Sequence, residues 1–579
     1  MDHAMMVEPK SPEALAVSFA SGCLLHILFY RRGERDLLAL RILQAYATLP
    51  IIVIGLSRLA EFKGWQHGNN LSAASVLFLE GAHILGLMTS ILCYRTIFHP
   101  LNKFPGPLSA RISNFYPTYL TTKNAHLYEE VEQLHQQYGD FVRLGPTQLS
   151  ITHPKAIDAI YSAKSPCTKG PFYNILNPRI SLHMIRDHKE HSTRRKIWDR
   201  ALSSKCKGYW VRLFIYSPAN KYKALRDYEP RVTKYTTQLL DRLNEMQGTT
   251  INASDWLNFY SFDVMGDLAF GKSFNMLRDG VNHYFLSSLH GSMKMVGALA
   301  HISWVIPILK LIPAVNSEDR QFWAWISGQV EERSKMKPDN PDVFAWILEE
   351  YERSPKTHQA KLNVEAEAYL IAVAGSDTTA ATLTGLLFEL ATNPSQIIKL
   401  REEIDQYFMD REHADHTSLS NLIHLNAVID ESLRLHPPVP SGLQRVTPPQ
   451  GLMVGDTFIP GNTIVQVPMH TIQRANRVEI QDERNFARPS EFIPERWTTS
   501  PELTKDKGVY APFSIGRYSC VGKQLGLMEV RYVIAHIIRA FDVRLGEGQT
   551  PEGFLKAKMD TFTLATPNLH LVFTPRPTK

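Results

Sequence analysis

One cysteine of this chain stands in a context that suits a metal ligand. The residues Phe513-Ser-Ile-Gly516-Arg-Tyr-Ser-Cys520-Val-Gly522 form a predicted loop that leads into an amphipathic segment ending near residue 540. We expect Cys520 at a helix N-terminus, where backbone N–H groups and the helix dipole lower the pKa of a thiol. Gly516 and Gly522 would let the loop approach a flat cofactor, and Phe513 could keep water from the sulfur. The alternative is an ordinary buried thiol.

An acid and an alcohol interrupt an apolar helix predicted over residues 365–390. The interruption reads Ala374-Gly-Ser-Asp377-Thr378-Thr. A glycine costs about 1 kcal/mol in a helix interior, and buried polar side chains cost more without partners, so the local violation favours a functional role. The alternative is a helix N-cap or a kink, with a Ser or Thr hydroxyl bonding back to the preceding turn.

A glutamate and an arginine share one face of another predicted helix. Glu431 and Arg434 are three residues apart, and the helix ends before Pro437-Pro438, because proline disfavours helix in the residue ahead of it. Such pairs are usually surface ion pairs worth a few tenths of a kcal/mol, on the order of 0.3. Farther along the chain stands Pro494-Glu-Arg496-Trp.

In this order and at this spacing the motifs resemble those of the cytochrome P-450 family, over residues 104–575. The loop carries the family's Phe, Gly, Cys and Gly at Phe513, Gly516, Cys520 and Gly522. The resemblance implies the cytochrome P-450 fold, mainly α with minor β sheets, and a haem b whose iron Cys520 ligates.

The resemblance assigns roles to the other two motifs. Thr378 would hydrogen-bond dioxygen above the iron, and Asp377 would relay protons to it. Glu431, Arg434 and Arg496 would form a buried network behind the cysteine loop. That network would support haem incorporation and take no part in turnover.

Partners for the haem carboxylates also carry over, with one departure from the family. Two positions before the cysteine the family usually has an arginine, whereas this chain has Tyr518, with Arg517 displaced by one residue. His191 and Arg195 match the family's helix motif, and Arg445 lies where a sheet arginine often reaches the haem. Tyr518 could donate only a neutral hydrogen bond, so we expect haem retention to depend more on the other three.

The first hundred residues differ in composition from the rest. Apolar runs at residues 14–30, 37–56 and 71–94 approach the ~20 residues that cross a bilayer. Arg41, Glu80 and His83 weaken the second and third runs, whereas basic residues flanking the runs favour a cytoplasmic catalytic domain. We expect residues 1–103 to be a membrane anchor of one to three transmembrane helices. Residues 104–579 would be the catalytic domain, on the cytoplasmic face of the endoplasmic reticulum membrane.

Composition excludes several other classes of protein. The chain has 579 residues, 44% of them hydrophobic and 21% charged, with a net charge of +6, which fits a globular core. No dense basic cluster indicates a nucleic-acid partner. The five cysteines are widely spaced without CxxC pairs, so zinc sites and a disulfide framework are not expected.

Three shorter stretches carry further expectations. Residues 206–223 and 475–481 fit the resemblance poorly, and we interpret them as insertions or gene-model errors. Alternation over residues 453–469 predicts a hairpin around Pro460-Gly-Asn.

The resemblance implies a monooxygenase that inserts one oxygen atom of O2 into an apolar small molecule, by hydroxylation or epoxidation in fungal secondary metabolism. The apolar stretches 370–378, 438–444 and 561–564 would line its pocket. Electrons would come from NADPH through NADPH-cytochrome P-450 reductase, with cytochrome b5 as a further partner. Asp377 and Thr378 favour this function over a haem-thiolate isomerase or dehydratase, which needs no dioxygen. A catalytically impaired haem-binding protein is a third alternative.

Overall fold

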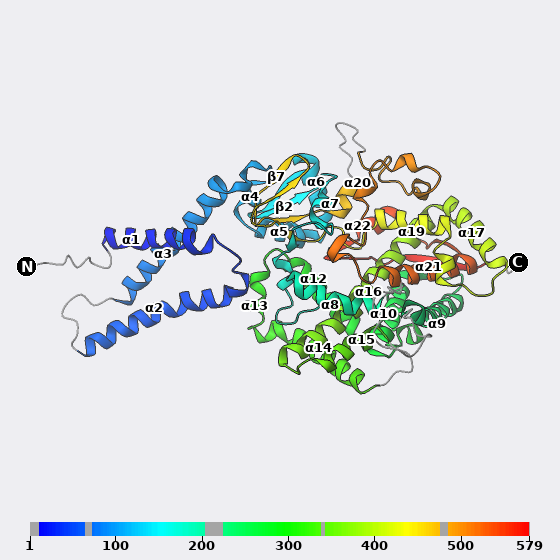
Figure 1. Cartoon of the computed structure of the whole chain (residues 1–579), viewed down its shortest axis with the longest axis horizontal. Helices are drawn as coiled ribbons and strands as arrows, with labels where there is room; N and C mark the ends of the chain where they lie inside the picture. The colour runs from blue at the N-terminus through cyan, green and yellow to red at the C-terminus, as the bar shows by residue number, and fades with distance from the viewer. Residues whose placement is uncertain (1–10, 64–71, 203–223, 337–341, 475–483, 578–579) are drawn as a thin grey trace, which may run out of the picture. The chain divides into compact units, whose positions relative to one another are not determined.

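The computed structural model describes residues 11–63, 72–202, 224–336, 342–474 and 484–577 (Figure 1). The two stretches interpreted as insertions, 206–223 and 475–481, lie outside the described residues. The chain divides into two compact units. One comprises residues 1–118, 143–148 and 299–317, and the other comprises residues 119–142, 149–298 and 318–579.

The helices dominate the structure. They are α1 Pro12–Leu25, α2 Ala39–Phe62, α3 Ala73–Cys93, α4 Leu108–Ile112, α5 Phe115–Asn124, α6 Leu127–Tyr138, α7 Ala156–Tyr161, α8 His188–Ala201, α9 Ala224–Glu245, α10 Ala253–Phe270, α11 Met276–Asp279, α12 Tyr284–Leu299, α13 Ile306–Leu309, α14 Pro313–Lys335, α15 Val343–Arg353, α16 His358–Thr392, α17 Pro394–Met409, α18 His416–Leu419, α19 Ile423–Leu435, α20 Met469–Arg474, α21 Lys523–Ala540 and α22 Pro551–Lys556. The strands are short: β1 Phe141–Gly145, β2 Gln148–Ile151, β3 Thr168–Lys169, β4 Thr250–Asn252, β5 Arg445–Val446, β6 Leu452–Val454, β7 Thr457–Ile459, β8 Ile464–Gln466, β9 Phe541–Leu545, β10 Met559–Thr561, β11 Thr563–Ala565 and β12 His570–Pro575. The predicted class, mainly α with minor β, is confirmed.

Helices α1 and α3 of the first unit pack backbone to backbone through two glycines. A Cβ atom on Gly22 would lie 2.0 Å from the carbonyl oxygen of His83. A Cβ atom on Gly86 would lie 2.0 Å from the carbonyl oxygen of Phe19. The Ser21 hydroxyl and the Nδ1 atom of His83 are hydrogen-bonded at 2.7 Å. Only glycine allows this approach, so the two helices form a closely joined pair.

Three N-terminal helical segments are long and apolar enough to cross a membrane. They span residues 12–30, 36–62 and 73–103. Large apolar side chains on them are exposed, among them Leu28, Ile51 and Leu85. Helix α16 is also long and apolar enough to cross a membrane, but 72% of its most apolar stretch is buried inside the protein. Helix α16 is therefore a core helix, and the N-terminal three are the candidates for membrane association.

The core of the second unit is built around α16. The helix is buried on nearly all sides over residues 366–390, as expected for a helix that is apolar all round. Helices α10, α19 and α21 contact it and contribute Phe262, Leu433 and Met528 to one continuous apolar core. Helix α16 begins seven residues before the predicted segment and continues through Asp377 and Thr378.

The small sheets of the second unit correct one prediction. Strand β5 pairs antiparallel with both β3 and β8, β9 and β4 flank β12, and β10 pairs with β11. The hairpin expected around Pro460 is wrong, because β6 pairs with β7 across Gly455-Asp456 and β8 joins β5 instead. Gly455 has φ +57°, which suits a tight turn.

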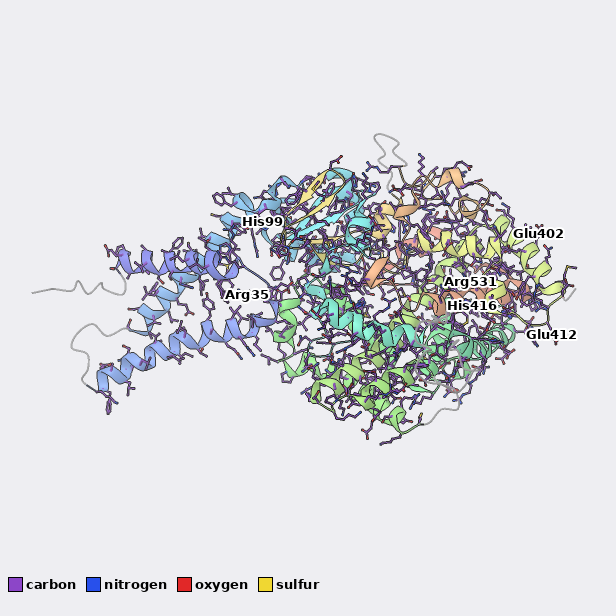
Figure 2. All side chains as sticks on the ribbon, in the orientation of Figure 1. Arg35, His99, Glu402, Glu412, His416 and Arg531 are labelled. Atoms are coloured by element: carbon purple, nitrogen blue, oxygen red, sulfur yellow. The ribbon has the colours of Figure 1, made fainter. Side chains whose placement is uncertain are left out.

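Helix α18 also packs against α21. His416 of α18 and Arg531 of α21 lie close together there (Figure 2). Burial and the charge of Arg531 lower the pKa of His416, so its imidazole is neutral at physiological pH. Arg531 is fixed by donating from Nε to the Asn426 side-chain oxygen at 2.8 Å.

Candidate active site

The cysteine loop is a tight structure that ends at helix α21. Residues Gly516–Tyr518 form a 3-10 turn, and the backbone N–H of Cys520 donates to the carbonyl of Phe513 at 2.8 Å. Helix α21 begins at Lys523, with Gly522 as its N-cap. The predicted place of Cys520 before a helix N-terminus is confirmed.

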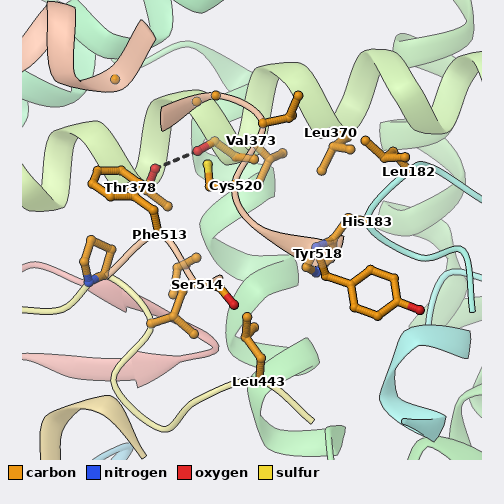
Figure 3. Close-up of a pocket in the computed structure, with 18 of the residues that line it drawn as sticks. Leu182, His183, Leu370, Val373, Thr378, Leu443, Phe513, Ser514, Tyr518 and Cys520 are labelled. Atoms are coloured by element: carbon orange, nitrogen blue, oxygen red, sulfur yellow. Dashed lines mark hydrogen bonds between the residues drawn. The ribbon is translucent and has the colours of Figure 1, made fainter. Parts of the chain in front are cut away.

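The loop borders a cavity of about 350 Å³, within the range of small-molecule sites. Helix α16 borders the same cavity, so Cys520, Phe513 and Tyr518 share it with Thr378 and Val373 (Figure 3). The other walls are mostly apolar, including Phe172 and Phe562, whose rings stack at 4.6 Å. The three stretches expected to line the pocket all contribute residues, Leu370, Val439 and Phe562 among them.

Opposing effects act on the Cys520 thiol. The Cys520 side chain lies deep within the protein. The part of its surface that is accessible faces the cavity. Burial raises its pKa, whereas the backbone N–H groups of Gly522 and Lys523 and the charge of Arg195 lower it. Burial has the larger effect, so the expected lowering of the pKa is not found in the protein alone. A metal ion at the sulfur would favour the thiolate.

Gly516 serves the packing of the loop. It has φ +70°, and a Cβ there would lie 2.4 Å from the backbone nitrogen of Ala163. Gly516 does not line the cavity, whereas Gly522 does. Room for a cofactor therefore stays a prediction for Gly522, which lines the cavity, whereas Gly516 lies elsewhere. At Gly516 the backbone of residues 161–163 takes the space.

Several cationic or neutral donors gather on one side of the cavity. His191 and Arg445 are 2% and 1% exposed, and both line the cavity with Arg195. Burial, followed by Lys169 and Arg195, lowers the pKa of His191 to about 3, so its ring is neutral. Arg195 donates from Nη1 to the carbonyl of Ser519 at 2.6 Å and pairs with Asp199.

The side chains of Tyr518 and Arg517 point to different surroundings. Tyr518 lines the cavity, and its ring packs edge-on against His191 at 4.7 Å. Arg517 does not line it, and its Nη1 atom instead lies 2.8 Å from Nδ1 of His188. The displaced arginine therefore does not replace the one expected two positions before Cys520.

The acid and alcohol of α16 face different surroundings. Thr378 lines the cavity, and its hydroxyl donates to the carbonyl of Ala374 at 2.7 Å (Figure 3, dashed line). This backward hydrogen bond is the alternative considered for the motif. Asp377 is not among the lining residues; its carboxylate is 8% exposed and lies 3.6 Å from Nε2 of His290 on α12.

Glu431, Arg434 and Arg496 form one fully buried network. The Glu431 carboxylate accepts from Arg434 Nε at 2.9 Å and Nη2 at 2.8 Å, and from Arg496 Nε at 2.9 Å. It also accepts from the backbone N–H of Ile493 and from the indole N–H of Trp497. All three charged side chains are 0% exposed. The carboxylate is thus saturated with donors and holds together two segments of chain.

Sequence reasoning missed several polar residues of the cavity wall, Lys169 and Glu529 among them. Lys169 lies in the two-residue strand β3, which is too short to give a periodic signal. Glu529 lies on α21, and both its carboxylate oxygens are buried without a hydrogen-bond partner among the described residues. Burial raises its pKa well above the usual value. An acid on the buried face of a predicted amphipathic helix was the available signal for Glu529.

The donor set fits a haem. The Nε atom of Arg445, Nδ1 of His191 and the hydroxyl of Tyr518 are buried without partners in the described part of the chain, and such groups require an acceptor. Two haem carboxylates would supply it, and the iron would occupy the space before Cys520. No group of three or more metal-ligating side chains occurs among the described residues, so a lone cysteine facing an apolar cavity suits a metal that brings its own ring ligands.

Comparisons with known proteins agree with this geometry. Residues 105–573 match the family model described as Cytochrome P450. Cytochrome P450 monooxygenase FCK2 of Fusarium pseudograminearum is 48% identical over 569 residues, which cover 98% of each chain. Cytochrome P450 monooxygenase phqL of Penicillium fellutanum is 38% identical over 580 residues, 99% of this chain and 97% of that protein. Tryprostatin B 6-hydroxylase of Aspergillus fumigatus is 35% identical over 567 residues, 97% and 96% of the two chains.

Proposed function

Because the chain belongs to the cytochrome P450 family, we propose that it hydroxylates or epoxidises an apolar small molecule in fungal secondary metabolism. It is a haem-thiolate monooxygenase, an oxidoreductase, by its relatives. The observation that carries the proposal is that the Cys520 thiol and the Thr378 hydroxyl line one apolar cavity. A relative named for hydroxylation of tryprostatin B supports hydroxylation here, and the stacked Phe172 and Phe562 suit an aromatic substrate.

We take the haem to be haem b, and we assign a separate role to each residue around it. When bound, the haem supplies an iron centre that activates dioxygen for transfer of one oxygen atom to substrate. Cys520 would hold the iron, Phe513 and Gly522 would lie beside the sulfur, and His191, Arg195 and Arg445 would bind the carboxylates. Thr378 would hold a proton at its Oγ1 atom within the cavity, and Asp377 would return protons to that position.

We further propose the arrangement in the cell. Residues 1–103 would anchor the protein in the endoplasmic reticulum membrane, and residues 104–579 would form the catalytic domain in the cytoplasm. NADPH would be oxidised by NADPH-cytochrome P450 reductase, which would pass the electrons to this enzyme, with cytochrome b5 as a second electron donor. The three apolar N-terminal helices support the membrane location.

Spectroscopy of the full chain in membranes tests the site directly. We expect the reduced carbon monoxide complex to show the thiolate absorption band, and Cys520→Ala to abolish both this band and turnover. Incubation with ¹⁸O2 and candidate apolar substrates should place one labelled atom in the product. A wild-type complex without the thiolate band, or product formed without label from O2, would refute the proposed function.

A further inference from the structure

Lys169 is a buried cation that faces another buried cation. In the antiparallel pair of β3 and β5 it lies directly opposite Arg445. The two side chains are 3% and 1% exposed, and both line the cavity that contains Cys520. Like charges directly opposite each other destabilise a sheet. Burial, with the charge of Arg445, lowers the pKa of Lys169 well below its usual value. An anion beside both groups would relieve this cost.

Among the residues that the structure describes, two acceptors contact the Lys169 ammonium, which leaves one donor available. Its ammonium donates to the carbonyls of Leu182 at 3.1 Å and His183 at 2.7 Å, and an ammonium has three N–H groups. The buried acid that acts on it is Glu367. That carboxylate already accepts from the backbone N–H of Leu182 at 3.0 Å and lies 3.5 Å from Arg194. The acid is thus shared, and the third N–H of Lys169 can take another acceptor.

Lys169 lies beside Tyr518, the residue that stands where the family usually has an arginine. Its Nζ atom lies 4.8 Å from the centroid of the Tyr518 ring, and the Arg445 guanidinium carbon lies 4.9 Å from the same centroid. Two buried cations therefore flank the side chain that stands where an arginine was expected. Arg517, turned toward His188, does not line this cavity.

We propose that Lys169 binds a carboxylate of the haem and supplies the positive charge that is missing at Tyr518. The inference rests on the proposed function, since it needs a bound haem. It adds a cofactor-binding residue from a strand two residues long, brought to the site by its register with Arg445.

Transfer of haem from the full-length protein to apomyoglobin measures this contact without turnover. Lys169→Met keeps the length of the side chain and removes its charge. A charge-assisted hydrogen bond is worth about 1.5–3 kcal/mol, so we expect haem loss to become about ten- to hundredfold faster. Lys164→Met, which makes the same substitution at an exposed lysine of the same segment that does not line the cavity, is the matched control and should lose haem at the wild-type rate.

A second variant separates haem binding from folding of the loop. Lys169→Met combined with Tyr518→Arg should return haem loss toward the wild-type rate, because the charge is restored beside Arg445. A wild-type transfer rate in Lys169→Met, or fast haem loss that Tyr518→Arg does not slow, would overturn the inference. Wild-type protein that never takes up haem would instead refute the proposed function.

An independent observation concerns the other side of α16. The Oδ1 atom of Asp377 is buried without a hydrogen-bond partner in the described residues, and it lies 3.6 Å from Nε2 of His290. The His290 side chain is 45% exposed, whereas that of Asp377 is 8% exposed. His290 therefore joins solvent to a carboxylate that solvent scarcely reaches.

The geometry points to His290 as a positioning residue that passes protons from solvent to Asp377. The imidazole takes a proton from solvent at Nδ1 and gives the proton on Nε2 to Oδ1 of Asp377, which leaves a neutral ring with its proton on Nδ1. Proton exchange with solvent at this exposed ring then returns a proton to Nε2 before the next transfer. Asp377 then carries the proton across α16 toward Thr378. This inference also rests on the proposed function, because only a reaction that consumes protons needs the route.

Two measurements test the route. They are the amount of product formed per NADPH consumed and the solvent deuterium isotope effect on turnover. Positioned proton transfer contributes about 10²-fold or more; since water can partly replace it, we expect His290→Phe to lower the product per NADPH about tenfold and raise the isotope effect. His290→Lys, which still carries a proton, should recover part of the loss. Lys294→Gln, one turn along α12 and exposed, should match wild type.

Two results would overturn the role of His290. One is an unchanged isotope effect and product per NADPH in His290→Phe. The other is an equal loss in His290→Phe and His290→Lys, which would indicate packing alone. A haem-loaded wild-type enzyme with no product from any substrate would bear on the proposed function and not on this route.

Discussion

Replacing Glu431 by glutamine tests the buried network behind the cysteine loop. Glu431→Gln keeps the shape of the side chain and removes the one negative charge between Arg434 and Arg496, both 0% exposed. The amide can accept at one oxygen only, whereas the carboxylate accepts five hydrogen bonds at two oxygens. Breaking a buried ion pair leaves an uncompensated charge and costs about 3–5 kcal/mol.

A matched exposed pair gives the comparison. Arg242 and Glu245 are also three residues apart on a helix, but the Glu245 side chain is 59% exposed. Exposed pairs of this kind contribute about 0–1 kcal/mol, so Glu245→Gln should leave stability nearly unchanged. The two substitutions have the same chemistry and differ in burial.

Urea unfolding of the haem-loaded protein, followed by the haem absorption band, measures both variants. We expect Glu431→Gln to unfold at clearly lower urea and to be recovered with less haem per chain, and Glu245→Gln to follow the wild type. Equal urea midpoints for the two variants would refute the reasoning, because burial would then not determine how much an ion pair contributes to stability.

Three further predictions concern the site. Thr378→Ala should lower product per NADPH about tenfold with haem content unchanged, because the hydroxyl that holds a proton in the cavity is lost; product and peroxide assays check this, and unchanged product yield would contradict it. Gly516→Ala should reduce haem-loaded yield, since φ +70° and the 2.4 Å approach to Ala163 exclude a side chain; normal yield would show that the loop adapts. Burial raises the pKa of Glu529, so the folded protein keeps a proton that the unfolded chain releases above about pH 4.3. The free energy of unfolding of the wild type therefore falls as pH rises from there toward the folded pKa. Glu529→Gln should be increasingly more stable than wild type between pH 5 and pH 8 in urea titrations, whereas a pH-independent difference would contradict the assignment.

Local patterns predicted the motifs, and tertiary pairing decided what lay around them. Cys520 and the Glu431 network were predictable because their residue types stand at fixed spacings within one loop or one helix turn. The direction of Asp377 was not predictable, since it depends on where α12 places His290 against α16. The hairpin around Pro460 was wrong because β8 pairs with β5, a choice made by distant residues. Lys169 was missed for the same reason: only strand register brings it to Arg445.

The contact between α1 and α3 limits how the protein can be shortened for expression without a membrane. Removing α1 alone would leave the groove at Gly86 open and would strip His83 of its bond to Ser21. The remaining α3 would then offer a bare backbone surface to detergent or to other copies, and His83 would keep only its contact from Nε2 to the Tyr46 hydroxyl. A soluble version should therefore begin after α3, so that both partners of the glycine contact are removed together.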